Sequence, residues 1–367
     1  MAEATALRLG RTFVGPAFDL LVIAGGLSFP LAAWLLYDGR SAAALIGLSI
    51  PVVALLVNQA HFAASTVRLY TKPGAFETLP FLTRWLPLVT LALLSVSVAL
   101  AGEVGRHLWA LSLTWSPFHY AAQTFGLASM YCYRSGCPLS SGERRALRWA
   151  CLLPFFKAFL GGTGAGYGLG WLVPAGVVAG DPLFFALFQG AVRFLDVAVF
   201  AAPLALFAWL AWRPAGSARA GDPAPARRTG MPLASLVVML ANGTWFVLFD
   251  YYDAFVWATV LHGLQYLAIV AVFHARDHAP PAASGGRGAL RQVAWFYALC
   301  VALGYGLFQC WPWAYRLAGF GAVESTLMVI GVINVHHFVV DAYIWRLRRD
   351  PNYRTVMGPP AGEPPRG

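Results

Sequence analysis

Six of the eight histidines in the chain lie within stretches of apolar residues: His61, His119, His262, His274, His336 and His337. In four of these stretches, a residue that can form hydrogen bonds stands three positions before a histidine, and another follows three or four positions after it. On a helix these positions share one face, so each imidazole would have polar neighbours above and below. Such neighbours can fix the tautomer of a ligating histidine, and neutral imidazoles bind Fe, Zn or Cu. The pattern predicts a buried metal site.

Two of the histidine segments are alike in sequence. Residues 58–65 read NQAHFAAS and residues 334–341 read NVHHFVVD. The second segment ends in Asp341, one turn after His337, and we assign it as the candidate catalytic residue. Its carboxylate has three open roles: a metal ligand, a group that orients a ligand, or a partner of Arg346 at the end of the helix. The ordinary alternative for each histidine is a hydrogen bond between helices, but burying so many ionisable groups in hydrocarbon is costly and marks functional pathways.

The depth of each histidine in its helix limits which of them can share one ion. His262 and His274 are twelve residues apart, which is about 18 Å along a helix, so they cannot bind the same ion. The predicted cluster consists of His61, His119 and His337 with either His336 or His274. If the helix ends lie a turn or two from their predicted positions, His262 replaces His274.

The composition indicates the elements that hold these residues. Of the 367 residues, 59% are apolar and 11% are charged, and the mean hydropathy is +0.61. Soluble domains have about a quarter of their residues charged, so an ordinary soluble enzyme is excluded. We expect an all-α polytopic membrane protein. Ten apolar stretches are long enough to be spans: residues 17–37, 41–62, 85–101, 107–131, 146–162, 183–212, 231–249, 254–275, 291–315 and 319–346.

The positive charges predict how these spans are oriented. Of the 26 Lys and Arg residues, 21 lie at the N-terminus, in the segments after every second span or within three residues of those segments, which predicts that both termini are cytoplasmic. The basic residues are spread between apolar stretches rather than gathered on one soluble face, so we expect no nucleic-acid partner. The strong preference for Arg, Ala, Gly and Pro favours a bacterial protein of the cytoplasmic membrane.

The pattern of apolar stretches predicts one transmembrane domain over residues 1–349. Residues 213–230 and 276–290 are rich in Pro, Gly, Ala and Arg and are predicted to be cytoplasmic loops, and residues 350–367 are predicted to be a disordered cytoplasmic tail.

The pieces His61-Phe62 and residues 337–341, on separate apolar helices, resemble the histidine-rich integral membrane oxygenases, in particular the bacterial carotenoid-cleaving Brp/Blh type. The resemblance implies a four-histidine iron site that cleaves a carotenoid with oxygen. The closely spaced triple histidine boxes of fatty-acid desaturases and alkane hydroxylases are absent from the sequence.

Three functions therefore stand as expectations. The first is a non-haem iron oxygenase or related oxidoreductase that acts on a membrane lipid, isoprenoid or carotenoid, with an electron donor or an oligomer partner. The second is an electron-transfer protein that binds haem b, since the spacing of His262 and His274 is typical of two haems stacked across a membrane. The third is a transporter or a complex subunit whose histidines relay protons or pack helices.

Overall fold

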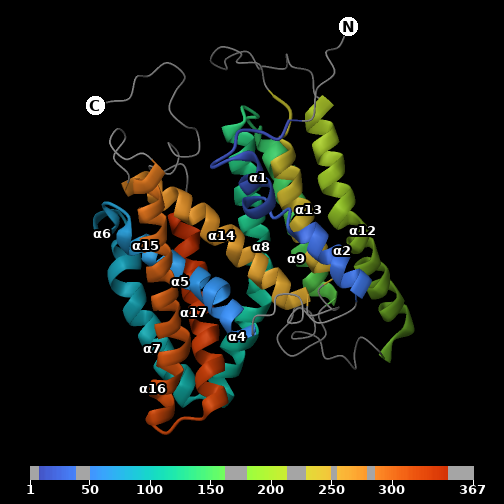
Figure 1. Ribbon diagram of the computed structural model, residues 1–367. Coiled ribbons are helices and arrows are strands. Elements are labelled where there is room, and N and C mark those ends of the chain that lie inside the picture. The colour runs from blue at the N-terminus through green and yellow to red at the C-terminus, as the bar shows by residue number, and fades with distance from the viewer. Residues whose placement is uncertain are drawn as a thin grey trace.

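A computed structural model describes residues 8–38, 50–161, 180–212, 229–248, 254–278 and 286–345. Within these ranges the chain is helical and contains no strand, which confirms the predicted all-α class (Figure 1). The helices are α1 (Pro16–Phe18), α2 (Ser28–Asp38), α4 (Ile50–Val53), α5 (Ala60–Thr71), α6 (Ala75–Thr78), α7 (Leu86–Ala99), α8 (Arg106–Arg134), α9 (Ser141–Gly161), α12 (Pro182–Trp212), α13 (Leu233–Val247), α14 (Ala254–His278), α15 (Gly286–Tyr305), α16 (Trp311–Leu317) and α17 (Ala322–Ile344). Five π-helical turns interrupt or extend them: Asp19–Ile23, Ala54–Gln59, Phe81–Trp85, Ala101–Gly105 and Gly306–Cys310.

Five described helical stretches are long and apolar enough to cross a membrane, which is the architecture of a membrane protein. They are Phe81–Ala99, Pro182–Ala211, Val256–His278, Arg287–Leu317 and Ala322–Ile344. Pro16–Ile23 and Ser28–Tyr37, which meet at an angle of 52°, form a sixth if the bent pair is one span. A total of ten spans and the cytoplasmic position of both termini stay predictions.

The helices that carry His61 and His119 are less apolar than these five because they carry polar side chains. Helix α8 is 29 residues long but contains the polar residues Ser112, Ser116, His119 and Gln123, whose spacing places them on one face. These polar side chains lower the mean hydropathy of α8, whereas α14 and α17, which carry His262 and His337, stay apolar enough to be spans.

Two predicted loops can be compared with the structure only at their ends. The helix α14 continues to His278 and α15 begins at Gly286, so both ends of the predicted loop 276–290 are helical, and residues 279–285 lie outside the described residues. Residues 213–228 of the predicted loop 213–230, and the predicted tail 350–367, also lie outside them.

The helices form two groups that α8 and α14 join (Figure 1). One group contains α5, α7, α15, α16 and α17, and the other contains α9, α12 and α13 with α2. Helix α8 contacts α9 and α13 on one side and α17 on the other, while α14 contacts α13 as well as α5 and α15. The two joining helices can therefore bring residues from both groups to one point.

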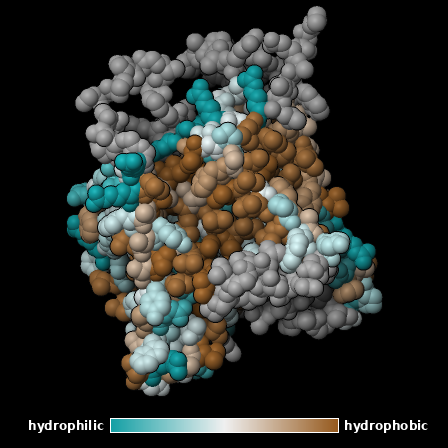
Figure 2. All heavy atoms as spheres, in the orientation of Figure 1, coloured by the Kyte–Doolittle hydropathy of each residue, from teal (hydrophilic) through white to brown (hydrophobic). Residues whose placement is uncertain are grey.

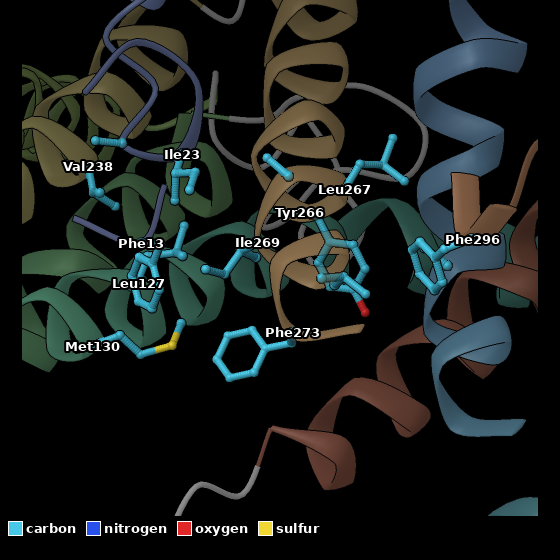
Figure 3. Close-up of a cluster of buried hydrophobic side chains, with 14 of the residues drawn as sticks. Phe13, Ile23, Leu127, Met130, Val238, Tyr266, Leu267, Ile269, Phe273 and Phe296 are labelled. Carbon is cyan, nitrogen blue, oxygen red and sulfur yellow. The ribbon is translucent and has the colours of Figure 1, made fainter. Parts of the chain in front are cut away.

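A buried apolar core fixes the positions of these helices. It includes Leu127 and Met130 of α8, Tyr266 and Phe273 of α14, and Phe296 of α15, together with residues of α5 and α13. In Figure 3, Ile269 and Phe273 lie between the α8 residues on one side and Tyr266 and Phe296 on the other. The core thus surrounds the segment of α14 that contains Tyr266.

The segment before α1 is held on this core by a buried carboxylate. Asp19 accepts hydrogen bonds from the backbone N–H groups of Phe13 at 2.6 Å, Val14 at 2.9 Å and Gly15 at 3.0 Å. Its Oδ1 also accepts a hydrogen bond from the hydroxyl of Tyr131 on α8 at 2.9 Å. This buried pair of a tyrosine and an aspartate ties the start of the described chain to α8.

Apolar side chains also cover much of the surface. Figure 2 shows apolar side chains across the middle of the face that is turned to the viewer in Figure 1, with hydrophilic residues toward the edges of that face. Exposed examples are Leu88 and Val89 on α7 and Leu187, Phe194 and Val197 on α12. Patches of this kind mark an interaction with lipid or another protein, and together with the apolar spans they agree with insertion in a bilayer.

Candidate metal centre

Four histidines from four helices meet in the interior of the molecule. They are His61 on α5, His119 on α8, His262 on α14 and His337 on α17. The ring centroid of His61 lies 4.5 Å from that of His337 and 4.9 Å from that of His262. The ring centroid of His119 lies 4.8 Å from that of His337 and 5.1 Å from that of His262. All four residues are buried. Segments that are far apart in the sequence thus form one cluster of imidazoles.

Three of these histidines lie at distances that suit one metal ion. One ring nitrogen from each of His61, His119 and His337 lies within 4.8 Å of the other two, and the Nε2 atoms of His119 and His337 are 3.1 Å apart. For bonds of about 2.1 Å in a tetrahedral site, neighbouring ligand atoms are about 3.4 Å apart. The three imidazoles therefore need little movement to bind a common ion.

A serine on α5 orients His337. The hydroxyl of Ser65 donates its hydrogen to the carbonyl oxygen of Phe62 at 3.1 Å, and its oxygen lies 3.0 Å from Nδ1 of His337. Because the hydroxyl hydrogen is already used, Nδ1–H of His337 is the donor to Ser65. The neutral ring then has its lone pair on Nε2, the atom that faces His119.

Other nitrogens of the cluster have no hydrogen-bond partner among the described residues. They are Nδ1 and Nε2 of His61 and Nε2 of His262. Most buried polar atoms in proteins are hydrogen bonded, because an unsatisfied one retains the cost of its desolvation. Several unsatisfied nitrogens at one point favour a ligand there.

A carboxylate and a phenol complete the cluster. Asp341 Oδ2 lies 3.4 Å from Nε2 of His337 and 3.8 Å from Nε2 of His119. The hydroxyl of Tyr266 on α14 donates a hydrogen bond to the other oxygen, Oδ1, at 2.5 Å. The predicted candidate Asp341 therefore faces the histidines rather than standing apart, and Arg346, its alternative partner, lies outside the described residues.

Aromatic side chains surround the imidazoles. The ring of His262 stacks on Tyr120 with centroids 4.0 Å apart, and Phe338 lies 4.8 Å from His119. Phe62 lies 4.7 Å from His61 and 5.2 Å from His337. These rings separate the cluster from water.

The structure does not bring the other two predicted ligands, His336 and His274, into the cluster. Nδ1 of His336 lies 2.7 Å from the hydroxyl of Thr90 on α7, because neighbouring residues point about 100° apart on a helix. His274 stacks on His278 and its Nδ1 lies 3.4 Å from Thr71 Oγ1. The prediction is therefore wrong for His336 and His274, and the predicted alternative, His262, lies beside His61 and His119.

Tyr266 and Ser65 were visible in the sequence only as polar neighbours on the helices of His262 and His61. Their structural partners lie on a different helix, α17. Contacts between helices depend on packing, and no signal in the sequence of one segment identifies them.

Comparison with known proteins adds no family to this geometry. No protein-family model matches the chain, and no curated protein and no solved structure matches it either. The proposed function therefore depends on the site alone.

Proposed function

We propose that the protein is an intramembrane metal oxidoreductase that binds non-haem iron and uses oxygen to oxidise a lipophilic substrate. The observation that carries this proposal is the buried trio of His61, His119 and His337, whose ligating atoms lie within 4.8 Å of one another. His262 adds a fourth imidazole beside them. The family resemblance implied a four-histidine iron site. We propose that this site is the cluster of His61, His119, His262 and His337.

A metal site explains the cluster better than helix packing does. A packing histidine needs a hydrogen-bond partner for its donor nitrogen, yet neither nitrogen of His61 has one among the described residues. Each neutral imidazole has one nitrogen with a lone pair, and an ion would bind the lone pairs that face one another in the cluster. Histidines with a carboxylate and open positions are the donor set that non-haem iron enzymes use to activate oxygen.

The spacing favours a bare ion over haem b. Two axial imidazoles on opposite faces of a haem would have their ligating nitrogens about 4 Å apart, twice an ordinary metal–nitrogen bond, with the porphyrin between them. Nε2 of His119 and Nε2 of His337 are 3.1 Å apart. The spacing of His262 and His274 suggested two stacked haems, but only His262 lies among other cluster imidazoles, whereas His274 lies beside Thr71 and His278.

The surroundings support a lipophilic substrate. The rings of Phe62, Phe338 and Tyr120 contact the imidazoles, so a substrate that reaches the ion meets apolar and aromatic walls. The helices around the site expose apolar side chains, which would allow a lipid, isoprenoid or carotenoid to enter from the bilayer. The preference for Arg, Ala, Gly and Pro is the ground on which we propose the bacterial cytoplasmic membrane.

Two kinds of oxidation differ in their requirement for a partner. Cleavage of a carbon–carbon double bond by O₂ puts one oxygen atom into each of two carbonyl products and needs no external reductant. Hydroxylation puts one atom into the substrate and reduces the other to water, so it needs two electrons from a donor protein. We propose the first reaction with a polyene substrate, for which no electron donor is required.

The test is oxygen uptake by the Fe²⁺-loaded protein in liposomes that contain a carotenoid. We expect oxygen consumption and loss of the polyene's visible absorption in the wild type without added reductant, and neither in His337→Ala. His336→Ala is the matched control, since the neighbouring histidine faces α7 and its loss should leave the reaction intact. Equal activity in the wild type and His337→Ala, or activity in neither, would contradict the proposal.

A further inference from the structure

The two oxygens of the Asp341 carboxylate face different partners. Oδ2 lies 3.4 Å from Nε2 of His337 and 3.8 Å from Nε2 of His119, which themselves are 3.1 Å apart. These three separations are close to the ligand spacing of about 3.4 Å expected around one ion. The helix provides this position directly, because a residue four positions after His337 lies on the same face of α17.

The second oxygen is already occupied. Oδ1 accepts the hydrogen bond from the hydroxyl of Tyr266, and the pair is buried. The tyrosine ring is fixed by edge contacts with His61 at 4.8 Å, His337 at 5.5 Å and Trp345 at 6.0 Å between centroids. The phenol therefore has little freedom to release Oδ1.

We propose that Asp341 binds the metal through Oδ2 alone and that Tyr266 is the positioning residue that keeps this carboxylate monodentate. The inference depends on the proposed metal site. A carboxylate that binds through both oxygens occupies one more coordination position than a monodentate one. By holding Oδ1, Tyr266 reserves a position on the ion for oxygen or substrate, next to His61 and His337.

The experiment uses the full chain purified in detergent and loaded with Co²⁺, whose visible absorption is strong in four-coordinate sites and weak in six-coordinate ones. Tyr266→Phe removes only the phenol oxygen and with it the hydrogen bond from Tyr266 to Oδ1. We expect this variant to bind as much Co²⁺ as the wild type but to show severalfold weaker visible absorption, because a second carboxylate oxygen joins the ion. X-ray absorption should show one additional oxygen in its coordination shell.

Two further variants make the test specific. Tyr131→Phe is the matched control, because Tyr131 is also a buried tyrosine bonded to an aspartate, Asp19, away from the histidines. Its cobalt spectrum should equal that of the wild type. Asp341→Asn replaces the ligating carboxylate with an amide and should lower Co²⁺ affinity about 10–100-fold, as other losses around metal ligands do. This variant tests the role of Asp341 even if Tyr266→Phe fails to fold.

The outcomes separate this inference from the proposed function. Stoichiometric Co²⁺ with the same spectrum in Tyr266→Phe and the wild type would overturn the role of Tyr266 while leaving the metal site in place. Unchanged affinity in Asp341→Asn would overturn ligation by the carboxylate. A wild type that binds no Co²⁺ would overturn the metal site and this inference together.

Discussion

Ser65 determines which nitrogen of His337 faces the other histidines. Its hydroxyl hydrogen is donated to Phe62, so the serine can only accept from Nδ1–H of His337. Hydrogen bonds of this kind to the second nitrogen orient a ligating imidazole and increase its basicity. In the proposed metal site the serine would therefore orient His337 without being a ligand itself.

We predict that Ser65→Ala retains the fold but binds Zn²⁺ or Co²⁺ about 10–100-fold more weakly than the wild type. The ring of His337 would lose its fixed tautomer and orientation. Isothermal titration of the detergent-purified protein measures the affinity. Ser95→Ala is the control, because Ser95 is an exposed serine that bonds to its own helix at Leu91. Equal affinities for both variants and the wild type would contradict the role of Ser65.

For single residues, the sequence predicts which side chains are candidates for the site but not the direction in which each side chain points. The repeated Asn at positions 58 and 334 was one basis of the prediction, yet Asn334 donates to Ile330 of its own helix rather than to a histidine. His336 and His337 are equivalent in the sequence. Which of the two faces the cluster depends on the rotation of α17 against α5, α7 and α8, and packing decides that rotation.

The packing of helix α15 against helix α5 fixes the position of His61. A Cβ on Gly304 would lie 2.9 Å from the backbone carbon and oxygen of Gln59 and 3.1 Å from the nitrogen of Ala60. These backbone atoms lie at the end of the π-helical turn Ala54–Gln59, directly before His61. Because backbone cannot move aside as a side-chain tip can, only glycine fits at position 304.

We therefore predict that Gly304→Ala moves α15 away from α5 and lowers the free energy of unfolding by about 1–3 kcal/mol, as overpacking does. Metal binding should weaken with it, since His61 would shift. Gly306→Ala is the control two residues further along, where a Cβ would meet no atom within 4 Å. Thermal unfolding in detergent measures the difference, and equal melting temperatures for the two variants would show that the close contact does not matter.

The helices themselves were predictable, and their irregularities were not. Apolar stretches with boundaries near Gly, Pro or charged residues predict ranges such as 107–131, which the structure extends to Arg106–Arg134. The π-helical turns depend on how one helix crosses another, so nothing in the local sequence predicts them. One of them lies immediately before His61, and turns of this kind often occur at functional sites.

The orientation of the helices across the membrane is a property of the whole molecule. The distribution of Lys and Arg predicts that the turn between α16 and α17 lies outside the cell and the segment between α8 and α9 inside it. Single cysteines at the exposed positions Ala318 and Gly142 would report on these two places. The natural Cys310 is exposed and must first be replaced by serine, whereas the other four cysteines are buried.

A membrane-impermeant maleimide applied to intact cells should label Ala318→Cys and leave Gly142→Cys unlabelled. In inverted membrane vesicles the pattern should reverse, because the two positions lie on opposite faces of the bilayer. Labelling of both cysteines from the same side, or the reverse pattern in cells, would show that the charge distribution has been misinterpreted.

In the proposed site, imidazoles from helices spread over the whole chain share one metal ion. The most direct measurement is the metal content per chain of detergent-purified wild type, His119→Ala, His337→Ala and the control His336→Ala, together with an absorption spectrum. We expect about one iron per chain without a haem band in the wild type and in His336→Ala, and loss of that iron in the other two variants. Folded, stable His119→Ala and His337→Ala proteins with the same metal content as the wild type would contradict the account.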